Sequence, residues 1–323
     1  MKLRMKLRQM LFVTAALALV PWAIAQPPEP PATKSGFVTT PDGIKIHYLE
    51  AGEVRAVGSM QVGGTPPPGA MTKGQVSLYD MRQQPSMLFI PGWTMPAWIW
   101  EQQIAHFAKT HRVVAMDPRS QGDSSQPSEG HYPAARARDI KAVVDQLHLA
   151  PVVLIGWSMG VSEAVAYVDQ FGTDTLAGLV LVDGWAGVDY DSKLTPQMWQ
   201  WAAGFQKDRR AQAQAFVPSM FKKPQSEEYL KRLTEASLRT PTNSAIALFV
   251  GLFTSDYRPA LAKINKPTLL VVAQSPWITI YQDMQKRIPG SRLEVFDAVG
   301  HALFVDEPAR FNSLLDDFLR DLE

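Results

Sequence analysis

The stretch Val152-Val153-Leu154-Ile155-Gly156-Trp157-Ser158-Met159-Gly160-Val161 decides the fold of this chain. Its first four residues form a short apolar run typical of a buried strand, and the residues from 161 to 171 are predicted to form a helix. The glycines of Gly-Trp-Ser-Met-Gly allow a sharp strand-to-helix turn with neighbouring chain close by. Such a turn exposes the Ser158 hydroxyl at a helix N-terminus, which favours developing negative charge. We therefore predict that Ser158 is a nucleophile.

Short apolar runs and predicted helices alternate on both sides of this turn. The predicted strands span residues 87–90, 112–116, 152–155, 179–182, 268–272 and 293–296, and the predicted helices span residues 98–109, 134–147, 161–171, 280–287 and 308–322. Continuous apolar strands joined by helices indicate a mostly parallel sheet that is covered on both faces. Residues 37–40 and 44–48 flank Pro41-Asp42-Gly43 and predict an opening hairpin. The predicted fold class is therefore α/β.

Two segments interrupt this alternation. Residues from 185 to about 263 are helix-rich and carry many aromatic side chains. We predict that they form a helical cap over the carboxyl ends of the strands, with most of the aromatic residues in the core of the cap. Residues 52–85 contain many glycines and prolines and one short strand candidate at 75–79, and are predicted to be a surface insertion.

The N-terminal residues have the pattern of a secretory signal. Lys2, Arg4, Lys6 and Arg8 precede an apolar run at residues 10–20 and then Ala23-Ile24-Ala25. We expect a signal peptide at 1–25, a proline-rich linker at 26–34 and a folded domain at 35–323. The apolar run is about half the roughly 20 residues that a membrane-spanning helix needs, so no stable membrane anchor is expected after cleavage. The mature protein is predicted to be periplasmic or secreted.

Composition excludes several classes of function. The chain has no cysteine, which excludes disulfides, a thiol nucleophile and thiolate metal sites. Hydrophobic residues make up 46% of the sequence, enough for a sizeable core. Removal of residues 1–25 takes away four basic and no acidic residues, leaving 28 basic against 31 acidic residues and a formal charge of −3. Neither nucleic acid nor an anionic membrane is therefore an expected partner.

A serine nucleophile needs a general base, and the sequence offers six histidines. His301 follows the last predicted strand and begins a loop before the closing helix, so it is expected to lie over the strand ends beside Ser158. The other five are predicted to be structural or solvated, because they lie on the hairpin, at helix ends or in a polar loop. These are His47, His106, His111, His131 and His148.

Four motifs together resemble the α/β-hydrolase superfamily. They are Ile90-Pro91-Gly92-Trp93, Asp117-Pro118-Arg119-Ser120-Gln121-Gly122-Asp123-Ser124-Ser125, Gly156-Trp157-Ser158-Met159-Gly160 and Gly300-His301. The resemblance extends from about Phe37 to the C-terminus, apart from residues 52–85. Residues 253–261, which precede Pro267-Thr268-Leu269, resemble the non-haem haloperoxidase and arylesterase branch. The resemblance implies an α/β-hydrolase fold with a helical cap, and a triad in the order serine, acid, histidine.

The third member of the triad departs from the usual family pattern. Members usually carry an aspartate shortly after the strand that corresponds to residues 268–272, but this chain has Ala273-Gln274-Ser275-Pro276-Trp277 there. Some members take the acid from the end of the preceding strand, where this chain has Asp183. An acid at that place would orient the imidazole and stabilise its cation. Asp183 is therefore the predicted acid, with a Ser–His dyad as the alternative; the turn at 117–125 is interpreted as structural.

The resemblance also implies where the oxyanion would bind. Family members commonly have His-Gly after the first core strand, and this chain has Pro91-Gly92. By resemblance the donors would be the backbone amides of Trp93 and Met159. Backbone donors do not depend on the side chain, so the substitution by Pro91 need not abolish the oxyanion hole.

These expectations combine into an esterase that acts through an acyl-enzyme and needs no cofactor or metal. The expected substrate is a small, uncharged ester with apolar parts, with Trp157, Trp185 and Trp277 as substrate-binding residues. The same site would also suit a perhydrolase, a lactonase, an amidase or an acyltransferase. A different class of function, a catalytically silent ligand-binding homologue, is suggested by Pro91 and by the missing acid after residue 272.

Overall fold

The computed structural model describes residues 32–53, 84–189 and 194–322. The predicted signal peptide, most of the linker and nearly all of the insertion lie outside the described residues. The folded part begins with Lys34, one residue before the predicted start, because Lys34 already pairs with Glu50 in the first hairpin.

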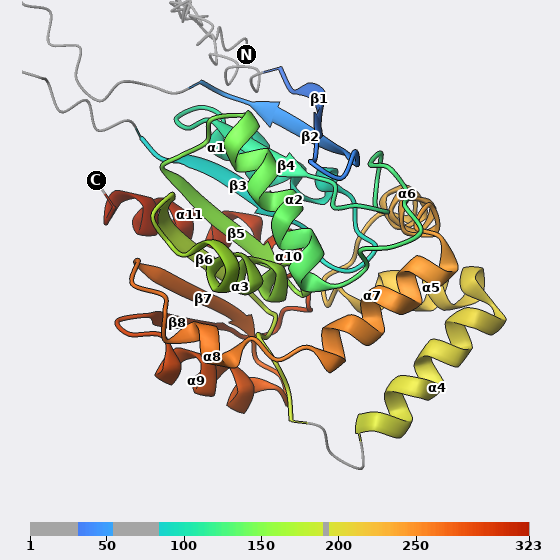
Figure 1. Cartoon of the computed structure of the whole chain (residues 1–323). Helices are drawn as coiled ribbons and strands as arrows, with labels where there is room; N and C mark the ends of the chain where they lie inside the picture. Colours follow the sequence, from blue (N-terminus) through green and yellow to red (C-terminus); the bar gives the residue numbers. More distant parts are fainter. Residues whose placement is uncertain (1–31, 54–83, 190–193, 323) are drawn as a thin grey trace, which may run out of the picture.

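One sheet of eight strands organises the described chain (Figure 1). The strands are β1 (Lys34–Thr39), β2 (Lys45–Ala51), β3 (Ser86–Ile90), β4 (Val113–Met116), β5 (Val152–Trp157), β6 (Leu176–Val182), β7 (Thr268–Ala273) and β8 (Arg292–Phe296). Their order across the sheet is β1-β2-β4-β3-β5-β6-β7-β8. The pairs β1–β2 and β2–β4 are antiparallel and the others are parallel. The carboxyl ends of β3 to β8 therefore meet at one edge of the sheet, as predicted.

Helices cover both faces of this sheet. The helical segments are the 3₁₀ helix η1 (Ala97–Trp100), α1 (Glu101–Phe107), α2 (Pro133–Gln146), α3 (Met159–Phe171), α4 (Leu194–Lys207), α5 (Arg209–Ser219), α6 (Glu227–Leu238), α7 (Thr242–Thr254), α8 (Arg258–Leu261), α9 (Ile278–Arg287), α10 (Leu303–Asp306) and α11 (Pro308–Arg320). Residues of α2, α3, α8 and α9 form a core with one face, in front of the sheet in Figure 1. Residues of α1, α10 and α11 form a second core with the other face.

The first helix after β3 differs from its prediction. A single helix was expected at residues 98–109, but the segment begins as the 3₁₀ helix η1 and continues as α1 only from Glu101 to Phe107. Short 3₁₀ turns are common where helices begin. Among the described residues, no helix combines the length and the apolar character needed to cross a bilayer.

The helical cap consists of α4 to α7, coloured yellow to orange in Figure 1. Phe205, Leu248 and Leu252 of these helices pack on Trp93 and Met159, which follow strands β3 and β5. The cap therefore sits over the strand ends. It is shorter than the expected range of 185 to about 263, because Ala260, Leu261 and Ile264 are buried with α3 and α9 against the sheet.

Candidate active site

Ser158 stands in a strained turn between β5 and α3. Its φ of 57° and ψ of −118° are unusual for a residue other than glycine. The turn is tight because a Cβ on Gly160 would lie only 2.6 Å from the carbonyl oxygen of Ile90. The Ser158 amide donates to the Val182 carbonyl at 2.9 Å, which ties the turn to the end of β6. Ser158 remains partly exposed, so its hydroxyl is presented to solvent in the setting that the sequence predicted.

Asp183 immediately follows β6. It is the residue after Val182, whose carbonyl accepts the hydrogen bond from the Ser158 amide. Its φ of 41° is also in the left-handed region, and its side chain is buried. Oδ1 accepts a hydrogen bond from the Ala273 amide at 2.9 Å, at the end of β7. The carboxylate from β6 therefore reaches the strand end after which family members usually carry their acid. Gly184 lets this bend pack against Ser158, because a Cβ there would collide with the Ser158 carbonyl.

His301 meets Asp183 across 118 residues of sequence. The Nδ1 of His301 lies 2.6 Å from Oδ2 of Asp183. Because a carboxylate only accepts, this geometry assigns the proton to Nδ1 and leaves Nε2 as the basic nitrogen. The His301 side chain is 32% exposed while that of Asp183 is 6% exposed, so the imidazole bridges a buried charge and the open site.

The loop that carries His301 is held on several sides. The indole of Trp157 donates to the His301 carbonyl at 2.9 Å, and the two rings lie 5.1 Å apart. The Gly300 amide donates to buried Asp306 at 2.7 Å, and the Ala302 amide donates to the Met220 carbonyl of the cap at 2.9 Å. These bonds fix His301 beside the turn that carries Ser158.

A buried tyrosine also faces the acid. Burial and the negative charge of Asp183 raise the pKa of Tyr281 well above its ordinary value. Its hydroxyl therefore stays protonated next to the carboxylate. Tyr281 is not predicted from the sequence, because nothing in α9 distinguishes it from an ordinary core residue.

The two expected oxyanion donors flank Ser158. A Cβ on Gly92 would lie 2.9 Å from Cβ of Ser158, which places the loop after β3 directly beside the nucleophile. The Met159 amide is the first N–H of α3, a position with no acceptor inside a helix. In the described parts of the chain, no hydrogen bond is assigned to the Trp93 amide. The first turn of α3 thus leaves the Met159 amide able to donate to a ligand.

The expectation that Trp157 binds substrate is wrong. Its side chain is only 1% exposed and packs against Trp100 and Phe304 in the core beneath the site. A residue inside β5 points its side chain into one of the packed faces, so it cannot reach a ligand at the strand end. Trp157 supports the His301 loop instead.

Trp185 and Trp277 lie together near the strand ends after β6 and β7. Their rings are 5.7 Å apart, and Trp185 also contacts Phe253 of α7 at 5.6 Å. Trp277 is 37% exposed. These two tryptophans form an apolar wall next to Asp183. The side chain of Trp93, by contrast, belongs to the cap core, and its indole donates to the Ala245 carbonyl.

A second set of serine, histidine and aspartate lies on β1, β2 and the carboxyl end of β4, on the far side of β3 from Ser158. The Nδ1 of His47 is 2.7 Å from Oδ2 of Asp117, and its Nε2 is 2.8 Å from the hydroxyl of Ser35. Ser35 is a residue of β1, inside the regular antiparallel pairing with β2. It has neither a helix N-terminus nor a strained backbone. This set ties the hairpin to the end of β4, in agreement with the structural role predicted for His47.

Asp117 also belongs to the one convergent group of metal-type ligands among the described residues, with His47 and Asp123. Each of the three already has protein partners. Asp117 accepts from the amides of Ala97 and Asp123, and Asp123 pairs with Arg239. These contacts account for the cluster as a structural network.

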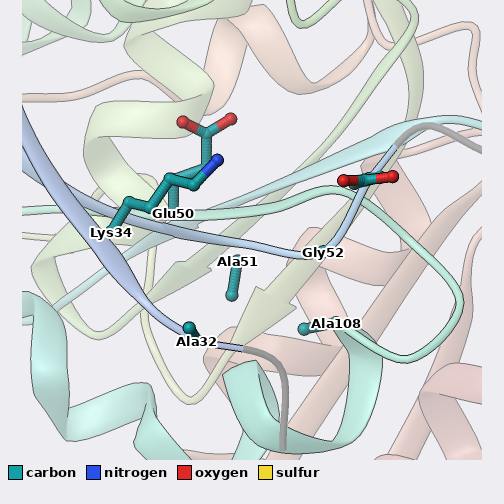
Figure 2. Close-up of a pocket in the computed structure, with 7 residues that line it drawn as sticks. Ala32, Lys34, Glu50, Ala51, Gly52 and Ala108 are labelled. Atoms are coloured by element: carbon teal, nitrogen blue, oxygen red, sulfur yellow. The ribbon is translucent and has the colours of Figure 1, made fainter.

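Hollows elsewhere on the surface lack comparable chemistry. One of them lies between the end of β2 and Ala108 (Figure 2) and has a volume of about 380 Å³. Its described lining carries Lys34, Glu50 and Glu53 as the only ionisable groups, and no histidine or serine. It offers no candidate nucleophile.

Comparison with known proteins identifies the family of this chain. A model of the alpha/beta hydrolase family matches residues 87–314, which contain Ser158, Asp183 and His301. The AB hydrolase superfamily protein YisY of Bacillus subtilis is 28% identical over 76% of this chain and 97% of that protein. A putative non-heme chloroperoxidase of Synechocystis is 25% identical over 78% of this chain and 98% of its own length.

A solved structure gives the same fold. The esterase EaEST of Exiguobacterium antarcticum superposes with a TM-score of 0.74, at 24% identity, over 88% of this chain and 98% of that esterase. The relatives thus include the haloperoxidase and esterase types that the sequence motifs resemble.

Proposed function

This chain belongs to the alpha/beta hydrolase family, and from that premise we propose that it hydrolyses carboxylic esters through an acyl-enzyme on Ser158. The observation that carries the proposal is the 2.6 Å contact between His301 and Asp183. It supplies an acid although none follows β7, and it fixes the imidazole tautomer that a general base needs.

The first half of the reaction forms the acyl-enzyme. Oγ of Ser158 adds to the ester carbonyl carbon while its proton passes to Nε2 of His301. The carbonyl oxygen becomes an oxyanion that the amides of Trp93 and Met159 stabilise. The C–O bond to the alcohol then breaks, and His301 returns the proton to the departing alkoxide.

The second half releases the acid. Water adds to the acyl carbon and gives its proton to His301, and the bond to Ser158 breaks as the hydroxyl regains that proton. Asp183 keeps its negative charge throughout and stabilises the imidazolium that forms twice in each turnover.

A small ester with apolar parts is the proposed substrate. Trp185, Trp277 and Phe253 provide an apolar wall beside Asp183, and ligand sites are mostly apolar with few polar groups. A series of p-nitrophenyl esters from acetate to palmitate measures the length of acyl chain that the site accepts.

The test is hydrolysis of these esters by purified protein and by Ser158→Ala, His301→Ala, Asp183→Asn and Asp183→Ala, with folding checked by circular dichroism. We expect activity in the wild type and a loss of about 10³-fold or more in each variant. Full activity in Ser158→Ala, or none in the wild type on any ester, would reject the proposal and favour a ligand-binding homologue.

Perhydrolysis is the second candidate, because one relative is described as a putative non-heme chloroperoxidase. Here hydrogen peroxide would replace water as the nucleophile that attacks the acyl-enzyme, giving a peroxyacid. Bromination of monochlorodimedone in the presence of acetate, peroxide and bromide measures this reaction. It separates the two candidates by the ratio of peroxyacid to acid formed.

Export to the periplasm or the medium is a further part of the proposal. It rests on the basic, apolar and Ala-x-Ala pattern of residues 1–25. Expression of the full chain followed by cell fractionation and N-terminal sequencing tests it. Gln26 is the expected first residue of the exported protein.

A further inference from the structure

One buried side chain binds the backbone on both sides of Trp93. The Nε2 of Gln121 donates to the carbonyls of Gly92 at 3.0 Å and Met95 at 2.8 Å, and its Oε1 accepts from the Thr94 amide at 3.0 Å. Gln121 is 1% exposed. The loop that holds the proposed oxyanion donor is therefore bonded at three backbone atoms to a single amide group.

This loop has a conformation that needs such support. Thr94 has a φ of 59°, which is unfavourable for a β-branched residue. Strained backbone of this kind persists only where the surrounding structure holds it. Gln121 provides that support at the residue next to the Trp93 amide.

Arg136 of α2 fixes the orientation of the Gln121 amide. Its Nη2 donates to Oε1 of Gln121 at 2.9 Å, and because arginine only donates, the oxygen of the amide must face it. The guanidinium is itself held, since Nη1 donates to Glu163 at 2.8 Å and Nη2 donates to the Arg119 carbonyl at 2.7 Å. Arg136 and Glu163 are both fully enclosed.

The same guanidinium also contacts Met159, the residue that carries the other expected oxyanion donor. Nη1 of Arg136 lies 3.6 Å from Sδ of Met159, whose backbone amide is the other expected donor. One connected network thus touches both residues that provide the oxyanion donors. Donors of this kind act only if they are held close to the position of the developing charge.

We infer that Gln121, oriented by Arg136, is a positioning residue that holds the Trp93 amide in place for the oxyanion. The inference rests on the proposed function. It assigns a catalytic consequence to a turn, residues 117–125, that the sequence analysis interpreted as structural only.

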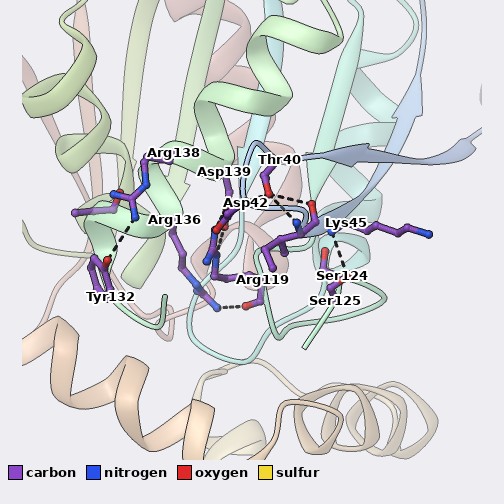
Figure 3. A network of polar contacts seen from close by, with 12 residues as sticks. Thr40, Asp42, Lys45, Arg119, Ser124, Ser125, Tyr132, Arg136, Arg138 and Asp139 are labelled. Atoms are coloured by element: carbon purple, nitrogen blue, oxygen red, sulfur yellow. Dashed lines mark hydrogen bonds and ion pairs between the residues drawn. The ribbon is translucent and has the colours of Figure 1, made fainter. Parts of the chain in front are cut away.

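A neighbouring ion pair serves as a matched control. Arg119 donates to Asp139 through Nε at 2.7 Å and Nη2 at 2.5 Å, and both side chains are as deeply buried as Arg136 and Glu163 (Figure 3). Arg119 also reaches Asp42 at the hairpin turn. Within the described residues, the hydrogen bonds of this pair reach neither Gln121 nor residues 92–95, so its loss is expected to lower stability without moving the Trp93 amide.

The experiment compares Gln121→Met, Arg136→Lys and Asp139→Asn with the wild type. For each protein, kcat and KM are measured on a p-nitrophenyl ester, along with the inhibition constant of a trifluoromethyl ketone and the melting temperature. The ketone forms a tetrahedral adduct whose oxyanion occupies the hole, so it reports on the donors directly.

In Gln121→Met we expect kcat to fall about 10- to 100-fold with KM within about threefold, and the inhibition constant to rise in the same proportion. Arg136→Lys keeps a cation for Glu163 but loses the planar donor to Gln121, so a smaller change in the same direction is expected. Asp139→Asn should melt at a lower temperature and keep kcat within about twofold.

The inference is overturned if folded Gln121→Met keeps the wild-type kcat and ketone affinity, or if Asp139→Asn loses as much kcat at a similar melting temperature. If Gln121→Met does not fold, the same criteria apply to Arg136→Lys. A wild type without esterase activity rejects the proposed function and the inference together, whereas an active wild type with an unaffected Gln121→Met rejects the inference alone.

Discussion

Two sets of serine, histidine and aspartate lie on either side of strand β3 in one sheet. In the set of Ser35, His47 and Asp117, both contacts of the relay are short, at 2.8 and 2.7 Å. In the set around Ser158, the His301–Asp183 contact is equally short, but the serine stands in a strained turn at the start of a helix. A list of contacts alone would rank the first set higher.

The settings of the two serines separate the sets chemically. Ser158 has two backbone amides beside it and a place at the edge where the parallel strands end. Ser35 lies within strand β1, whose backbone is paired with the antiparallel strand β2. Charge that develops on a substrate at Ser35 would find no comparable pair of donors. The difference teaches that the backbone around the nucleophile, more than the side-chain relay, marks a hydrolase site.

Substitution of the two serines should give the largest difference in ester hydrolysis between the two sets. We expect Ser158→Ala to lose about 10⁴-fold or more in kcat/KM, because no nucleophile remains. Ser35→Ala removes only a hydroxyl contact to His47 and should stay within about twofold of wild type. Ester hydrolysis rates of the two variants are measured side by side. Loss of activity in Ser35→Ala instead of Ser158→Ala would contradict the assignment of the nucleophile.

Substitution of the two aspartates should give the next largest difference, because one variant loses activity and the other loses stability. Asp183→Asn cannot orient His301 with Nε2 free to accept a proton, so kcat is expected to fall about 10³- to 10⁴-fold with little change in melting temperature. Asp117→Asn keeps only one of the two oxygens that accept from the amides of Ala97 and Asp123, so one amide loses its acceptor at a cost of about 1 to 3 kcal/mol of stability. Urea unfolding together with kcat separates the two effects. Equal losses of kcat in Asp183→Asn and Asp117→Asn would contradict a catalytic role for Asp183 alone.

Glycine at the two serine positions should act on stability with opposite signs. Ser158→Gly relieves a φ of 57° and is expected to stabilise the fold by about 1 to 2 kcal/mol while abolishing activity. Ser35→Gly increases the freedom of a strand residue and is expected to destabilise by about 0.5 to 1 kcal/mol. Chemical denaturation measures both. Destabilisation by Ser158→Gly would mean that the turn is not strained.

A third Ser–His contact provides a difference that depends on pH. Burial, then the charges of Arg136 and Arg119, lower the pKa of His131 to about 4, and Ser120 lies 2.9 Å from its Nε2. The folded state therefore resists protonation, so the contribution of His131 is fully present above about pH 6.5 and declines as pH falls toward 4. Melting curves of wild type and His131→Gln should converge on acidification over this range. Parallel curves would contradict the lowered pKa.

The sequence predicted the parts of the site that depend on local geometry. The strand, glycines and helix around Ser158 sit within ten residues, and the steric demand of that turn is visible in the sequence itself. The order of strands and helices was likewise predictable, because each apolar run is continuous. The bounds of the cap were not, since the return of Ala260 and Leu261 to the sheet depends on tertiary packing.

Residues that act across long sequence separations were harder to predict. Asp183 is predicted by resemblance to family members that take the acid from the end of the preceding strand, while its bond to the Ala273 amide exists only in the folded sheet. Gln121 and Arg136 were missed because a polar turn and an arginine in a helix carry no sign of burial.

The most direct test of the account is covalent labelling of the native protein with a fluorophosphonate, followed by peptide mass spectrometry. We expect one adduct, on the peptide that contains Ser158, with none on the peptide that contains Ser35, and a much slower reaction in His301→Ala. An adduct on Ser35, or no adduct on folded wild-type protein, would contradict the assignment of Ser158 as the nucleophile.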